Sequence, residues 1–259
     1  SRKRFRMLEK LVRNIRELDL SSSIDTYSEL ATNLEAVDPA DPEKSMHYAL
    51  AGTPAVYDLD FDGFADVIFA GDLGGNVWKW VIKDIGIDPV NGTTTDTSQP
   101  NWTFKKFFSA PVYDSGTNKY FKSFFFAPSA TFMSSKLWVA FGSGERANLQ
   151  FEGFAAPADE NNRFYAVQDL DPLEKELTPL PVLDESVLKD VTGDGTCTDV
   201  TGFTGFLMKG ADGEKFVTQS ELFFYYVFVG SFIPETPADP CDAGGNSYLY
   251  AFKVHCGEG

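Results

Sequence analysis

The chain has 259 residues, of which 43% are hydrophobic and 15% aromatic, and this composition supplies enough apolar surface for a buried core. Its formal net charge is −16 at pH 7, and an acidic surface disfavours nucleic acid as a partner. The longest apolar run, residues 222–229, is far shorter than the roughly 18 to 20 residues that a membrane-spanning helix needs, so we predict no membrane span.

The first 45 residues are predicted to be separate from the rest. Apolar residues recur at helical spacing between Phe5 and Ile15, which predicts an amphipathic helix, and a polar linker follows. Residues 1–16 carry a net charge of +6, which we interpret as a solvated helix face rather than a phosphate or membrane patch. No signal-peptide pattern opens the sequence, so we expect any export signal to lie upstream of residue 1. The predicted domains are residues 1–45 and 46–259.

From residue 53 onward the sequence predicts an all-β fold. Short runs of β-branched and aromatic residues alternate with gaps that Pro and Gly punctuate. The predicted strands include residues 53–57, 67–70, 102–108, 120–126, 136–141, 215–217 and 222–229.

Residues 58–66 form the most informative motif. Carboxylates stand at alternate positions, Gly63 allows a sharp turn, and a further Asp closes the run. Ca²⁺ takes roughly six to eight oxygen ligands, and alternate side chains of a tight loop converge on one point. We therefore predict a calcium loop between two strands, and an acidic surface turn is the alternative interpretation. The predicted ligands are Asp58, Asp60, Asp62, the backbone carbonyl of Phe64, and Asp66.

A second acidic loop, residues 190–199, is a weaker candidate for a cation site. Asp190, Asp194 and Gly195 repeat part of the first motif, but Thr occupies two of the ligand positions.

Three segments run from a turn asparagine into an aromatic strand. They are aligned on Asn76, Asn161 and Asn246, which follow one another at steps of 85 residues. Regular spacing of such units is typical of β-propellers, whose four-stranded blades take about 40 to 50 residues each. A step of 85 predicts two blades, or one blade with a large insertion. Counting two blades per step, residues 46–255 supply about four or five blades.

Such a partial ring would expose unpaired sheet edges and an apolar blade face. We therefore expect another chain, or a second copy of this one, to complete it, with residues 5–15 as a candidate contact.

The three cysteines allow one disulfide. We predict that Cys241 pairs with Cys256 and that Cys197 stays free, although a pairing of Cys197 with either of the others is open.

The chain resembles the C-terminal β-propeller of the PilY family, the bacterial type IV pilus biogenesis factors and tip-associated adhesins. The stretches that carry the resemblance are residues 52–66, 70–78, 138–144, 230–234 and 239–248. It implies a protein of the cell surface or extracellular space that binds calcium at the loop of residues 58–66. It also implies a role in pilus extension, retraction and attachment, with other pilus or surface-assembly proteins as partners. The family propeller is longer, and its adhesive N-terminal region has no match here.

Catalytic motifs are weak throughout the chain. Two histidines leave little for acid–base chemistry, Ser143 lacks the spacing of a nucleophile elbow, and the glycines of residues 71–75 precede a strand rather than a helix. We therefore predict a non-enzymatic calcium-binding protein. The alternatives are a structural subunit of an extracellular filament or surface assembly, and a quinone-dependent dehydrogenase propeller, for which the chain is too short.

Overall fold

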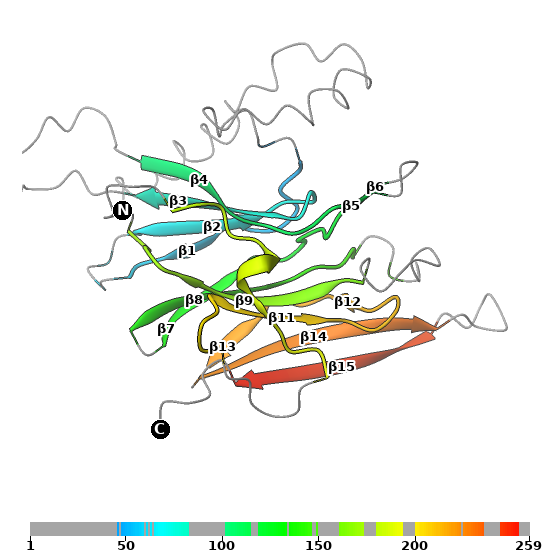
Figure 1. Ribbon diagram of the computed structural model, residues 1–259. Coiled ribbons are helices and arrows are strands. Elements are labelled where there is room, and N and C mark those ends of the chain that lie inside the picture. The colour runs from blue at the N-terminus through cyan, green and yellow to red at the C-terminus, as the bar shows by residue number, and fades with distance from the viewer. Residues whose placement is uncertain are drawn as a thin grey trace, which may run out of the picture. The chain divides into compact units, whose positions relative to one another are not determined.

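The fold is all-β. The computed structural model describes residues 46, 48–59, 61, 63, 65–82, 102–114, 119–133, 135–146, 149, 161–173, 180–193, 200–223, 225–235 and 244–253. All the described elements lie in residues 48–259, one of the two units into which the chain divides (Figure 1). The predicted N-terminal helix, the three cysteines, Asp60, Asp62 and Phe64 lie outside the described residues. No described segment is a helix with the length and apolarity needed to cross a membrane.

Three sheets, antiparallel except for one edge strand of the middle sheet, follow one another along the chain and in space (Figure 1). The first sheet contains, in order, β1 (Ala55–Tyr57), β2 (Val67–Gly71), β3 (Asn76–Ile82) and β4 (Trp102–Ser109). A two-stranded ribbon, β5 (Tyr113–Asp114) with β6 (Lys119–Tyr120), comes next.

The middle sheet contains β7 (Ser129–Met133), β8 (Lys136–Gly142), β9 (Arg163–Asp169) and β11 (Gly205–Lys209), with β10 (Lys189–Asp190) parallel to β11 at its edge. The 3₁₀ turn η3 (Glu185–Val187) precedes β10.

The last sheet is built around β14 (Tyr226–Glu235). One edge of β14 pairs with β12 (Lys215–Phe216) and β13 (Glu221–Phe223), and the other pairs with β15 (Gly244–Lys253).

The repeated asparagine-to-aromatic segments occupy equivalent places. They lie at β3, β9 and β15, and each of these strands pairs with the strand directly before it in the chain, namely β2, β8 and β14. The step of 85 residues therefore corresponds to one sheet with insertions, such as residues 170–204 between β9 and β11. The expectation of four or five blades was wrong, because the described residues form three large sheets that do not close into a ring.

The middle sheet is buried on both faces. One apolar cluster joins it to the first sheet and uses alternate residues of β8 and β9, namely Leu137, Val139, Phe141, Tyr165 and Val167. A second cluster joins it to the last sheet and uses the intervening residues Trp138, Ala140, Phe164 and Ala166. Successive side chains of a strand point to opposite faces, so β8 and β9 are apolar at nearly every position.

Gly142 allows the middle and last sheets to approach closely. A Cβ atom at this position would lie 2.5 Å from the Cβ of Phe216 in β12, which is too close for any side chain. The glycine at the end of β8 is therefore required by packing between sheets.

Two predicted strands were wrong. Of residues 120–126, only Tyr120 belongs to a strand, because the segment crosses between sheets instead of joining a ladder. Its Phe124 N–H donates to Asp72 O at 3.0 Å, and Ser123 O accepts from Gly144 N at 3.0 Å. Residues 222–229 form a hairpin rather than one strand, since Tyr225 adopts a φ of 65° and reverses the chain between β13 and β14.

A buried ion pair joins the first and middle sheets. Lys79 Nζ of β3 lies 2.6 Å from Asp169 Oδ2 of β9, and the two side chains are 0% and 4% exposed. Lys79 Nζ also donates to the backbone oxygen of Asp171 at 2.8 Å. Removing one partner of such a pair leaves the other charge buried without compensation.

We expect Lys79→Met to lower the free energy of unfolding by about 3 to 5 kcal/mol, because the Asp169 carboxylate would stay buried without its cation. The double variant Lys79→Met/Asp169→Asn should recover a large part of this loss. Urea denaturation measures both, with the exposed Lys136→Met of β8 as the control. A single variant that is no less stable than the double variant would contradict this role of the pair.

Candidate metal centre

The acidic loop joins β1 to β2, as predicted. Tyr57 pairs with Val67 at its base, and Asp66 N donates to Tyr57 O at 2.8 Å. The loop therefore starts and ends on the ladder of the first sheet, with Asp58 and Asp66 at its two ends. The pairing of β1 with β2 therefore fixes the positions of these two predicted ligands.

The two carboxylates hold the loop closed. Asp58 Oδ2 accepts a hydrogen bond from Gly63 N at 2.8 Å, and Asp66 Oδ2 accepts one from Leu59 N at 2.5 Å. Gly63 has a φ of 91°, which glycine adopts without strain, and Phe61 has a φ of 63° with its side chain 86% exposed. This conformation directs Phe61 outward.

One carboxylate oxygen in this loop is buried without a hydrogen bond. It is Asp58 Oδ1, for which the described part of the chain provides no partner. Burying such an oxygen is unfavourable unless it is paired or bound to a metal ion. The residues present therefore fit a hard cation on the inner side of Asp58. Within the described residues, no three His, Cys, Asp or Glu side chains gather into a metal-binding group, and Asp60 and Asp62 lie outside them.

Tyr57 anchors the loop to the middle sheet. Its hydroxyl accepts a hydrogen bond from Ala130 N of β7 at 2.7 Å and donates to Pro128 O at 3.3 Å. Burial raises the pKa of Tyr57 above its usual value of 10.0, while the bond from Ala130 opposes this rise. Tyr57, which directly precedes the predicted ligand Asp58, thus links the first and middle sheets.

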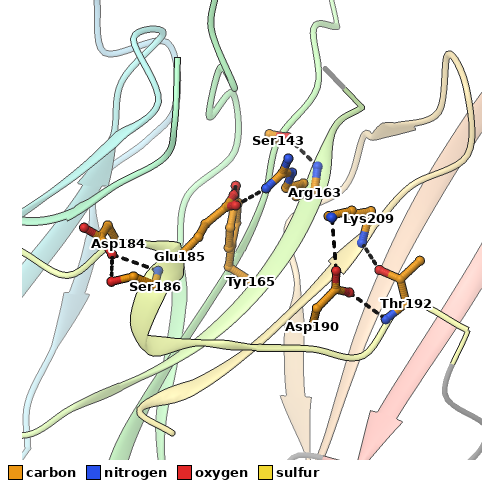
Figure 2. Close-up of polar contacts among 9 residues, drawn as sticks. All are labelled: Ser143, Arg163, Tyr165, Asp184, Glu185, Ser186, Asp190, Thr192 and Lys209. Carbon is orange, nitrogen blue, oxygen red and sulfur yellow. Dashed lines mark hydrogen bonds and ion pairs between the residues drawn. The ribbon is translucent and has the colours of Figure 1, made fainter. Parts of the chain in front are cut away.

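The second acidic loop begins with a carboxylate that a lysine already neutralises. Asp190 Oδ2 pairs with Lys209 Nζ at 3.1 Å, and Asp190 Oδ1 accepts a hydrogen bond from Thr192 N at 2.9 Å (Figure 2). Although partial burial raises the pKa of Asp190, the bonds from Thr192 and Lys209 outweigh it and lower the pKa overall. This arrangement supports β10 against β11 and does not favour a cation at Asp190.

A charged cluster lies beside the first residue of β9 (Figure 2). The guanidinium of Arg163 pairs with Glu185 of η3, and the Tyr165 hydroxyl donates to Glu185 Oε1 at 2.7 Å. Burial raises the pKa of Tyr165, and the charge of Arg163 opposes this effect. Tyr165 therefore stays protonated and serves as a donor in the core.

Ser143 is part of the same region and is fully buried. Its hydroxyl accepts from Arg163 N at 2.8 Å and donates to Asn162 Oδ1 at 3.1 Å. Both contacts join the end of β8 to the start of β9.

No family model matches the chain. A type IV pilus biogenesis factor PilY1 homolog of Xylella fastidiosa is 40% identical over 65 residues, which are 24% of this chain and 4% of that protein. The crystal structure of the Pseudomonas aeruginosa PilY1 C-terminal domain matches 78% of this chain with a TM-score of 0.53 at 17% identity. The chain is a relative of the PilY1 C-terminal domain.

The relation to PilY1 confirms the resemblance drawn from the sequence motifs, and the fold matches over most of the chain. The chain spans 46% of the solved PilY1 domain and a small part of the curated homolog.

Sequence reasoning did not select the buried charges Lys79 and Arg163, or the half-buried Glu185. A cationic residue within an aromatic strand could have indicated two of them. Lys79 stands between Trp78 and Trp80, and Arg163 directly precedes Phe164. Glu185 carried no signal, because residues 184–186 look like an ordinary polar turn.

Proposed function

We propose that the chain is a calcium-binding, non-enzymatic part of a β-propeller that acts in type IV pilus assembly or surface attachment. Its place is the cell surface or extracellular space, and its partners are other pilus or surface-assembly proteins. In this proposal residues 46–259 are the calcium-binding, propeller-like domain, and residues 1–45 would be an N-terminal helix followed by a polar linker.

The proposed role in pilus assembly rests on the relation to PilY1. Local sequence identity to a PilY1 homolog and the fold of the PilY1 C-terminal domain are independent observations that agree. Three successive meandering sheets packed face to face are the blade arrangement that a propeller repeats.

The loop of residues 58–66 supports the proposed calcium binding. Asp58 has a buried oxygen for which no described residue provides a hydrogen bond, and the carboxylates of Asp58 and Asp66 close the loop at opposite ends. In this proposal Asp58, Asp60, Asp62, the carbonyl of Phe64, and Asp66 bind one Ca²⁺. The ion would neutralise the carboxylates and tie the β1–β2 connection together.

Calcium should stabilise the native chain by mass action. With a Kd of roughly 10⁻⁴ to 10⁻³ M, 5 mM Ca²⁺ should raise the Tm by about 3 to 8 °C relative to EGTA, and Mg²⁺ should have a smaller effect. Asp58→Asn should remove most of this shift, whereas Asp212→Asn, in the turn between β11 and β12, should retain it. Differential scanning calorimetry measures these shifts. A Tm that calcium leaves unchanged in the unmodified chain, or an equal shift in Asp58→Asn, would refute calcium binding at this loop.

The pilus role predicts a surface phenotype. In a bacterium that carries this gene, its deletion should lower the number of surface pili seen by electron microscopy, and the intact gene should restore it. Complementation with the Asp58→Asn variant separates the two parts of the proposal, because it tests whether piliation depends on calcium. Normal piliation after deletion would contradict the pilus role whatever the outcome of the calcium titration.

A further inference from the structure

Tyr57 connects the acidic loop of the first sheet to the start of β7. Its backbone oxygen accepts from Asp66 N at 2.8 Å, so its main chain takes part in closing the loop. Its hydroxyl accepts from Ala130 N at 2.7 Å and donates to Pro128 O at 3.3 Å. A single residue therefore contacts both the loop and the two residues on either side of Ser129.

Leu59 connects the loop to the same interface through the core. Its N–H donates to Asp66 Oδ2 at 2.5 Å, and its side chain packs against the apolar cluster between the first and middle sheets. Closely packed interiors transmit displacements instead of absorbing them. A change in the position of the Asp66 carboxylate would therefore change the packing of Leu59 at this interface.

The contacts continue from β7 into the last sheet. The hydroxyls of Ser129 and Ser220 lie 2.6 Å apart, and both side chains are buried. Because Ser220 Oγ donates its proton to Ala140 O at 3.0 Å, Ser129 is the donor in this pair. Ser220 directly precedes β13, so the pair joins the middle sheet to the first residue of that strand.

β13 depends on its neighbours for order. Within the described residues it pairs with β14 alone, along three residues, and it lies beside β7. Burial is the largest cause of the raised pKa of Tyr57, and the negative charge of Glu221 adds to it, which places β13 within electrostatic reach of the Tyr57 hydroxyl. Short edge strands with few contacts open locally before the rest of a fold.

We propose that calcium binding at the loop of residues 58–66 is coupled to the order of β13 through Tyr57, Ser129 and Ser220. This inference rests on the proposed calcium binding and adds the element that this binding regulates. Fixing Asp58 and Asp66 would also fix Tyr57 and Leu59 against β7, and β7 would then hold Ser129 in place for Ser220. Coupling between two sites is reciprocal, so loosening Tyr57 from β7 should weaken calcium binding.

Hydrogen exchange followed by mass spectrometry measures the coupling in the full chain, with about 5 mM Ca²⁺ or with EGTA. Peptides that cover β13 should exchange about five- to tenfold more slowly with calcium, within the usual range of coupling between sites. Peptides that cover β12 are the internal control, because β12 is a short strand that also pairs with β14 but lies off the proposed path. Their exchange should change less than about twofold.

Two variants separate the steps of the path. Ser220→Ala removes the hydroxyl between β7 and β13, and should abolish the slowing at β13 while the Kd for calcium stays within about threefold. Tyr57→Phe keeps the ring, and should abolish the slowing and raise the Kd about five- to tenfold. The control is Leu183→Ala, which truncates another side chain packed on the same cluster and should retain both the slowing and the affinity.

Circular dichroism and thermal unfolding establish that the three variants are folded. If calcium binds but leaves the exchange of β13 unchanged, or slows β12 or the Ser220→Ala variant equally, the coupling is wrong while the calcium site stands. A Kd that Tyr57→Phe leaves unchanged would also overturn the coupling. Absence of calcium binding to the unmodified chain would overturn both the site and the coupling.

Discussion

The two-sided burial of the middle sheet is the constraint on which the rest of the structure depends. β8 and β9 supply side chains to both apolar clusters, so neither the first nor the last sheet has a core of its own. The rings of Phe141 and Tyr165 stack on each other, with centroids 5.3 Å apart, in the cluster shared with the first sheet, and Phe164 stacks on Phe252 of the last sheet. The three sheets are therefore expected to unfold together rather than one by one.

Polar contacts specify how the first sheet sits on this core. The ion pair of Lys79 with Asp169 and the hydroxyl of Tyr57 against Ala130 both cross from the first sheet to the middle sheet. Such contacts select one arrangement, because any other would leave a charge or a donor buried without a partner. The acidic loop follows Tyr57 directly, so its shape depends on the same interface.

Much of the fold could be predicted from the sequence, because strands with regular pairing to their neighbours have a clear sequence pattern. The strand predicted at residues 136–141 and the loop between two strands at residues 58–66 are confirmed, since β-branched and aromatic runs flanked by turn residues determine both. The hairpin at Tyr225 was missed because residues 223–226 are all aromatic and contain no glycine or asparagine to indicate a turn. The blade count failed because insertions lengthen the repeat, as residues 170–204 between β9 and β11 do. In the candidate site, the position of the loop was predictable, whereas the buried oxygen of Asp58 and the anchoring role of Tyr57 depend on tertiary packing.

Native-state hydrogen exchange tests the central claim, that the middle sheet holds the three sheets in one cooperative unit. Amides of β8 and β9 should exchange most slowly, and those of β2, β3 and β14 should join them in a single global opening as denaturant is added. A first sheet or a last sheet that loses protection at clearly lower denaturant, while β8 and β9 stay protected, would contradict this account.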